Sequence, residues 1–91
     1  MQSILQKDRE CLLCKSTNVE CHHVFGGTAN RELSTKYGLT TWLCPEHHRG
    51  KSGVHNYREL DLTVKRFAQR EAMKYYGWSE ADFRGIFGKL W

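Results

Sequence analysis

Four residues with side chains that can bind zinc constrain the fold of this chain most strongly, and they come in two pairs with the same spacing. Two residues separate Cys11 from Cys14, and two residues separate Cys44 from His47. A gap of this length lets a tight turn direct both side chains at one point, and zinc requires four nitrogen or sulfur ligands in a tetrahedron. We therefore predict a structural zinc site formed by all four residues, with disulfides or buried free cysteines as the alternative.

The length and composition of the chain favour a metal over disulfides. Its 91 residues suffice for one domain, whose small core is only marginally stable by itself. A composition of 40% apolar and 26% charged residues is typical of a folded domain. The apolar runs are too short to span a membrane, and the first residues lack the apolar stretch of a secretory signal. We therefore expect a cytoplasmic protein, in whose reducing surroundings clustered cysteines indicate metal binding.

Positive charge is concentrated in the second half of the chain. The net charge is +4 and the isoelectric point is about 9.0. Seven basic and three acidic residues lie between positions 49 and 74, so this segment accounts for the whole net charge. Within it Arg66, Arg70 and Lys74 recur every four residues, which places them on one face of a helix. We predict that this face, with Arg49 and Lys51, binds the DNA backbone; a solvated helix face is the alternative.

Two short runs between the paired ligands have strand composition. Residues 19–25 form the first and end sharply at Gly26 and Gly27, and residues 39–43 form the second. The segment 28–38 between them is a loop or a short helix, and residues 1–10 are a polar lead-in that is frayed or helical. The expected order is therefore the turn with Cys11 and Cys14, a strand, a loop or short helix, a strand, and the turn with Cys44 and His47.

Helical patterns fill the last third of the chain. Apolar residues between Val64 and Tyr76 recur at helical spacing, and Gly77 is suited to end that helix. A capping signal at Ser79 opens a final short helix. The apolar side of this helix, expected in the core, consists of Phe83, Ile86, Phe87 and Leu90. Strands followed by helices predict the α+β class.

All five histidines lie between positions 22 and 55, in three places. If His47 completes the zinc site, then His22, His23, His48 and His55 remain. Neutral imidazoles that lie close together can hold a second divalent ion and still leave one ring free as a base. The sequence therefore suggests a second metal site beside the first.

The order of these motifs resembles that of a known family. A Cys-x-x-Cys pair, then His-His followed by glycines, then Leu-Cys-x-x-His-His before a helix, is similar to the HNH endonucleases. These ββα-metal nucleases, common in phages and prophages, include forms with a structural zinc. The resemblance covers residues 11–55, roughly half the chain. It implies a single α+β domain over residues 1–91, with a zinc-stabilised ββα-metal core at 11–55 and a helical extension at 56–91.

The resemblance also implies roles for the histidines. His22 and His48 would bind a catalytic divalent metal (Mg²⁺, Mn²⁺, Ni²⁺ or Zn²⁺), and His23 would be the general base that activates water. His55 would be a further metal ligand or a phosphate contact. Helical spacing would place it about two turns beyond His48 on the same side. The products would be a 5′-phosphate and a 3′-hydroxyl.

Two positions leave alternatives open. The family's middle asparagine, which orients the base, is missing just before the second strand, and the intervening loop offers only Asn30. Either Asn30 orients His23, or a backbone carbonyl near Gly38 or Leu39 does so, or the site is degenerate. Cys21, next to His22, is an alternative to His47 as the fourth zinc ligand.

The leading hypothesis from the sequence is a metal-dependent DNA endonuclease that nicks DNA as a monomer. A zinc-stabilised DNA-binding or scaffold module without catalytic activity is the alternative from another class. A third interpretation is an accessory protein of phage packaging or recombination, whose nuclease activity depends on a partner. A second, exchangeable metal ion distinguishes the first hypothesis from the second.

Overall fold

A two-stranded antiparallel sheet lies at the centre of the fold. The computed structural model describes residues 2–91, and in them β1 (Glu20–His23) pairs with β2 (Thr40–Leu43). Glu20 lies opposite Leu43 and His23 lies opposite Thr40. Because side chains alternate along a strand, Glu20 and His22 share one face of β1, and Cys21 and His23 share the other. The predicted strands are confirmed, each slightly shorter than expected.

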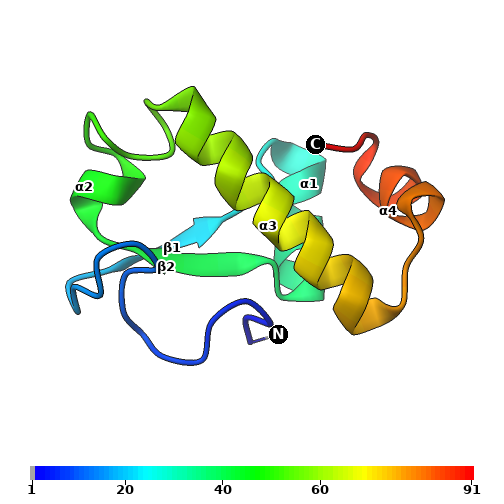
Figure 1. Cartoon of the computed structure of the whole chain (residues 1–91), viewed down its shortest axis with the longest axis horizontal. Coiled ribbons are helices and arrows are strands. Elements are labelled where there is room, and N and C mark those ends of the chain that lie inside the picture. Colours follow the sequence, from blue (N-terminus) through cyan, green and yellow to red (C-terminus); the bar gives the residue numbers. More distant parts are fainter. Residues whose placement is uncertain (1) are drawn as a thin grey trace.

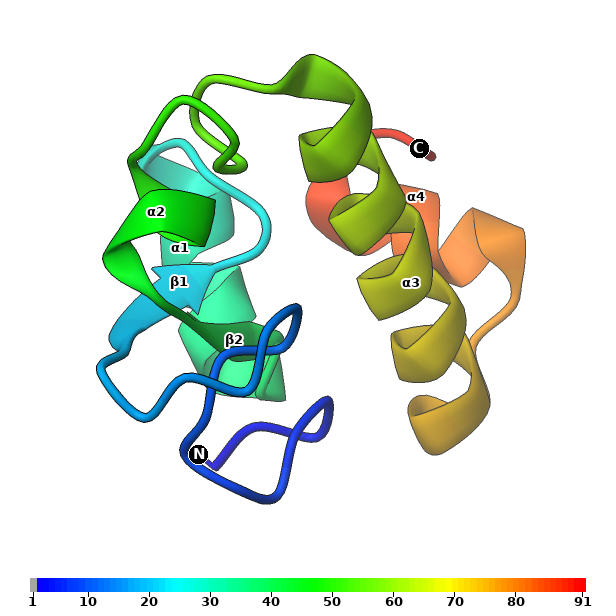
Figure 2. The ribbon, with the colours of Figure 1, turned by 60° about the vertical axis from the view of Figure 1, so that its left-hand side comes forward.

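Four helices of residues 2–91 pack around this sheet or against one another. Helix α1 (Thr28–Tyr37) connects the strands, and the single turn α2 (Pro45–His48) follows β2. The long α3 (Arg58–Tyr76) crosses the molecule diagonally, and α4 (Glu80–Phe87) folds back beside it (Figures 1 and 2). The structure confirms the small α+β class. None of the helices in residues 2–91 is long and apolar enough to cross a membrane.

Glycines and a capping box set the helix ends. Gly77, with φ of 69°, ends α3 as predicted. Ser79 and Asp82 form the predicted capping box: the Asp82 N–H donates to Ser79 Oγ at 3.1 Å, and the Ser79 N–H donates to the Asp82 carboxylate at 2.9 Å. Helix α3 begins at Arg58, earlier than the apolar pattern from Val64 predicts, because its first turn is mostly polar.

The N-terminal lead-in is neither frayed nor helical within residues 2–12. It runs beside β2 and hydrogen bonds to it and to the turn before it. The Ile4 N–H donates to the Gly38 carbonyl at 2.9 Å, and the Leu12 N–H donates to the Trp42 carbonyl at 2.9 Å. The side-chain oxygen of Gln6 accepts from the Trp42 N–H at 2.6 Å. These bonds satisfy backbone groups that the free edge of β2 would otherwise expose.

The aromatic core fixes the chain directly after His22 and His23. Phe25 is fully buried, and its ring centroid lies 4.7 Å from that of Trp91, 4.8 Å from Phe87 and 5.5 Å from Phe83. The Ser34 hydroxyl holds the Phe25 backbone by accepting from its N–H and donating to its carbonyl. The predicted core residues Phe83 and Phe87 are buried, so the C-terminal helices pack onto the end of β1.

Candidate metal centres

The two distant ligand pairs meet at one point. Ligand atoms of Cys11, Cys14, Cys44 and His47 all lie within 4.8 Å of one another. Cys14 Sγ is 3.7 Å from Cys44 Sγ, and His47 Nδ1 is 3.6 Å from Cys11 Sγ and 3.3 Å from Cys44 Sγ. A tetrahedral zinc ion would separate two sulfurs by about 3.8 Å, and a sulfur and a nitrogen by about 3.5 Å. The four predicted ligands therefore have the geometry to bind a metal ion such as zinc.

Backbone hydrogen bonds shape both half-sites. In the first, the Lys15 N–H donates to the Cys11 carbonyl at 2.9 Å and the Cys11 N–H donates to the Ser16 carbonyl at 2.8 Å. Lys15 has φ of 66°, an uncommon conformation that closes this turn. In the second, Pro45 takes the first position of α2, and the His48 N–H donates to the Cys44 carbonyl at 2.8 Å. Both turns are thus held by the backbone itself.

No disulfide ties up the cysteines, and Cys11 favours the thiolate form that binds zinc. All four are free thiols in the structure, so the disulfide alternative is not adopted. Burial raises the pKa of Cys11, but backbone hydrogen bonds with Cys44, Leu13 and Cys14 outweigh it and lower the pKa to about 6. A thiolate at neutral pH is the form that binds zinc. Cys21 is exposed and lies outside the cluster, so His47 is the fourth member as predicted.

His22, His48 and His55 form a second cluster. One ring nitrogen of each lies within 4.8 Å of the others, and the ring centroids are 4.7–5.5 Å apart. Only 5% of His22 is exposed, and its Nε2 has no hydrogen-bond partner among residues 2–91. A buried polar atom without a partner costs free energy that a bound ligand would recover. The three imidazoles therefore fit a divalent cation that accepts nitrogen ligands.

The surroundings of His22 keep its ring neutral. Burial, followed by the nearby His48 and His55, lowers the pKa of His22 to about 3. A neutral imidazole has a lone pair to offer, whereas a protonated one repels a cation. His22 is therefore available as a ligand throughout the physiological pH range.

His55 reaches this cluster by a different route from the one that we expected. The prediction of a continuing helix is wrong, because α2 ends at His48 and residues 49–57 form turns. The loop folds back on α2 through hydrogen bonds from the Val54 N–H to the His47 carbonyl (2.9 Å) and from the His55 N–H to the His48 carbonyl (3.2 Å). Gly53 makes this return possible, since a Cβ there would lie 2.8 Å from backbone carbons of α2.

A carboxylate that the sequence analysis missed borders the cluster. Oε1 of Glu20 is 2.7 Å from Nδ1 of His48, and the Arg49 guanidinium bonds to both Glu20 oxygens. Hydrogen bonds from Arg49 and then from His48 lower the pKa of Glu20 to about 2. The available signal was strand alternation, since an acid two residues before His22 lies on the same face of β1.

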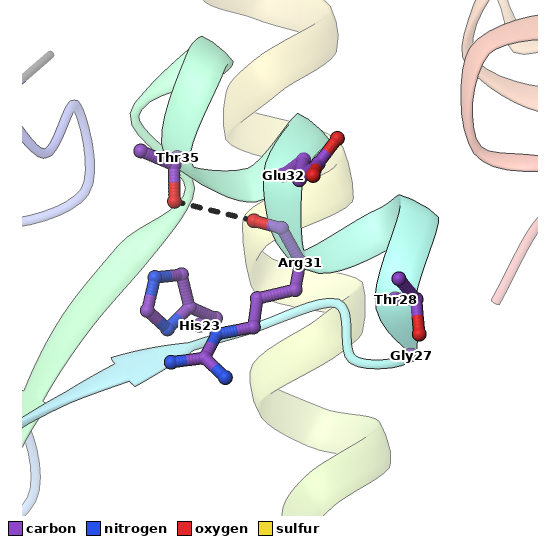
Figure 3. A pocket seen from close by; sticks show the side chains of 6 residues that line it. All are labelled: His23, Gly27, Thr28, Arg31, Glu32 and Thr35. Carbon is purple, nitrogen blue, oxygen red and sulfur yellow. Dashed lines mark hydrogen bonds between the residues drawn. The ribbon is translucent and has the colours of Figure 1, made fainter.

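His23 borders several cavities, and Arg31 borders two of them as well. One, of about 270 Å³, is bordered by the three clustered histidines together with His23 and Arg31. The other, of about 660 Å³, extends from His23 along α1. Figure 3 shows the Arg31 side chain extending from α1 toward the His23 ring. Burial, followed by the charge of Arg31, lowers the pKa of His23. Arg31 is a second residue that the sequence analysis missed; helical side chains lean toward the N-terminus, which brings it to β1.

The candidates for orienting His23 have other partners. The Asn30 amide donates to the Phe87 carbonyl at 3.2 Å. The Gly38 carbonyl accepts from Ile4, and the Leu39 carbonyl accepts from the Val24 N–H at 3.1 Å. Within residues 2–91, none of these groups is hydrogen bonded to His23.

The predicted DNA-binding residues differ in their surroundings. Arg66, Arg70 and Lys74 are all exposed on α3, and Lys74 lies 3.6 Å from Glu71. Lys51 is exposed, whereas Arg49 is bound to Glu20 although 66% of its side chain is accessible. The three α3 residues therefore form the basic face expected from the sequence, while Arg49 already has an anionic partner.

Comparison of the chain with protein-family models, with curated proteins and with solved structures found no significant match.

Zinc binding tests the first cluster. We expect Cys44→Ser to lose the zinc that withstands dialysis against a chelator, because one of four ligands is removed. Cys21→Ser is the matched control, since it makes the same change outside the cluster and should retain one zinc per chain. Metal content by mass spectrometry measures both. Loss of zinc from Cys21→Ser would overturn the assignment of His47.

Gly53 tests the route by which His55 reaches the second cluster. Gly53→Ala should move the loop away from α2, at a cost of about 1–3 kcal/mol in stability, and weaken Co²⁺ binding to the three histidines. Gly85→Ala is the control, since a Cβ there meets nothing within 4 Å. Co²⁺ titration of the zinc-loaded proteins, followed by absorbance, measures the change. Equal Co²⁺ affinities in the two variants would contradict this account.

Proposed function

We propose that the chain is a metal-dependent DNA endonuclease of the HNH type, in which a structural zinc supports a ββα-metal site. One observation supports this most strongly. The cluster of His22, His48 and His55 adjoins the three-cysteine, one-histidine cluster and opens into a cavity shared with His23 and Arg31. A zinc-stabilised module without catalytic activity would need the first cluster but not the second.

The three-histidine cluster would hold the catalytic cation. Its imidazoles are neutral donors of the kind that Mn²⁺, Ni²⁺ and Zn²⁺ accept, and Mg²⁺ could bind with water completing its shell. A divalent ion bound there would neutralise charge on the phosphoryl group and on the leaving 3′ oxygen. His22, buried and held in β1, would fix the position of the ion relative to the sheet.

His23 would act as the general base. It lies on the strand beside His22, is partly accessible from the cavity, and has a lowered pKa that keeps it unprotonated at neutral pH. A ring nitrogen of His23 would accept a proton from the attacking water. Arg31, which borders the same cavity, would donate hydrogen bonds to phosphate oxygens and hold the DNA strand close to His23. Hydrolysis would leave 5′-phosphate and 3′-hydroxyl ends.

The basic face of α3 would supply affinity for the DNA backbone. Arg66, Arg70 and Lys74 are accessible and recur at helical spacing. Contacts of this kind bind phosphates without regard to sequence. A non-catalytic DNA-binding module is the second candidate, and one observation favours it: no described residue hydrogen bonds to His23 to orient it.

Plasmid nicking distinguishes the two candidates. The zinc-loaded protein should convert supercoiled plasmid to open circle when Mg²⁺, Mn²⁺ or Ni²⁺ is added, and chelator should stop the reaction. His23→Ala should fold and retain zinc but nick about 10²–10⁴ times more slowly, because a general base contributes that much. Gel electrophoresis of the plasmid forms measures both rates. DNA binding without nicking would favour the non-catalytic module.

Salt dependence of DNA binding tests the basic face. Replacing Arg66 and Arg70 together with Gln should weaken binding and reduce the slope of log K against log salt by about two, roughly one for each lost phosphate contact. The charge-matched control replaces Arg84 and Lys89 with Gln; both residues are exposed, Arg84 on α4 and Lys89 just after it. Fluorescence anisotropy at several salt concentrations measures the slopes. Unchanged binding, or an equal loss in the control, would refute the proposed face.

A further inference from the structure

The contact between Glu20 and His48 determines which nitrogen of His48 can bind a metal. Oε1 of Glu20 lies 2.7 Å from Nδ1 of His48, and the His48 side chain is only 14% exposed. An ionised carboxylate accepts hydrogen bonds but cannot donate them, so Nδ1 must hold the proton. In a neutral ring with a proton on Nδ1, the lone pair is on Nε2. His48 is thereby left with one nitrogen for the ion.

The Glu20 carboxylate is held in place by Arg49 and by the position of Glu20 in the sheet. Arg49 donates to Oε1 of Glu20 through Nε at 3.0 Å and to Oε2 through its terminal nitrogen. Two hydrogen bonds from one guanidinium fix the plane of a carboxylate as well as its position. Pairing of Glu20 with Leu43 places its backbone in the sheet, two residues before His22. The carboxylate therefore has little freedom to turn away from His48.

Glu20 lies next to the three-histidine cluster without belonging to it. The cluster consists of His22, His48 and His55, and no carboxylate oxygen of residues 2–91 belongs to it. Both Glu20 oxygens are already bonded to His48 or Arg49. A carboxylate can accept a hydrogen bond from the ring nitrogen of a ligating histidine that does not bind the metal. Such a bond sets the orientation of the ring and makes its other nitrogen a stronger ligand for the metal.

We propose that Glu20, oriented by Arg49, is the positioning residue that fixes His48 as an Nε2 ligand of the divalent ion. This inference rests on the metal site described under the proposed function. It assigns Arg49 a role within the protein, where the sequence analysis expected a DNA contact. Strand β1 would then contribute twice to the site: His22 would bind the ion, and Glu20 would orient His48 on α2.

Metal affinity in the absence of DNA tests the proposal. Glu20→Met keeps the length of the side chain but removes its acceptor, and it should weaken Mn²⁺ binding to the zinc-loaded protein by about 10–100-fold. Glu20→Gln retains one acceptor oxygen and should lose less. Glu71→Met is the matched control, because Glu71 also pairs with a basic residue, Lys74, but lies on α3. Calorimetric titration measures the affinities, and zinc content and melting temperature show whether each variant folds.

The tautomer of His48 provides a readout that needs no metal. Long-range ¹H–¹⁵N correlation spectra of the wild type without the second ion should show the proton of His48 on Nδ1, and Glu20→Met should shift the population toward Nε2–H. Arg49→Gln, which leaves Glu20 in place, should give a smaller shift. An Nε2–H tautomer in the wild type would overturn the proposal whether or not Glu20→Met folds.

The variant His48→Ala separates this proposal from the proposed function. If the wild type binds Mn²⁺, His48→Ala abolishes binding and Glu20→Met leaves it unchanged, Glu20 has no positioning role while the metal site stands. If the zinc-loaded wild type binds no Mn²⁺, both the metal site and the role of Glu20 are wrong. Graded loss from Glu20→Gln to Glu20→Met, with Glu71→Met unchanged, supports both.

Discussion

The single turn α2 links the two candidate metal clusters of this protein. Its consecutive residues His47 and His48 belong to different clusters, one with three cysteines and one with two histidines. Adjacent residues on a helix point about 100° apart, so one short turn can serve two centres only if its backbone is rigidly placed. A zinc ion bound through Cys44 and His47 would supply that rigidity, because a four-residue helix is not stable alone. A zinc ion in the first cluster would therefore add to the backbone hydrogen bonds that place the second cluster.

Backbone hydrogen bonds of the loop after α2 likewise place His55. Its backbone bonds to the carbonyls of His47 and His48, and Gly53 packs directly against the turn. On the other side, β1 brings His22 through the sheet, and Phe25 anchors the end of that strand among the aromatic residues of α4. Each of the three histidines is thus placed by a different backbone element. Such a site can hold a small ion in a defined geometry without flexible side chains closing around it.

The sequence predicted what depends on local spacing and missed what depends on tertiary contacts. Residue pairs with two residues between them, the strands beside them and the capping box at Ser79 are local features. The structure brings the two pairs together in one cluster and confirms the strands and the capping box. Helical spacing failed for His55, because a glycine-containing loop brings it back to α2. Arg31 and Glu20 were missed because their significance comes from tertiary contacts: Arg31 borders the cavity beside His23, and Glu20 bonds to His48 and Arg49, which follow it by 28 and 29 residues.

The charge around the second cluster gives a reason why Glu20 bonds to the cluster residue His48 but does not belong to the cluster itself. Three neutral imidazoles would leave the full charge of a divalent ion available to a phosphate, whereas a ligating carboxylate would cancel half of it. Glu20, bonded to His48 and shared with Arg49, makes a ligand more basic while its own charge is offset by the guanidinium. Arg31 adds a positive group on the cavity wall beside His23. With a divalent ion bound by the three histidines, the positive field in the cavity would favour an anionic ligand, such as the monoanionic phosphodiester of the proposed DNA substrate, over a neutral or cationic one.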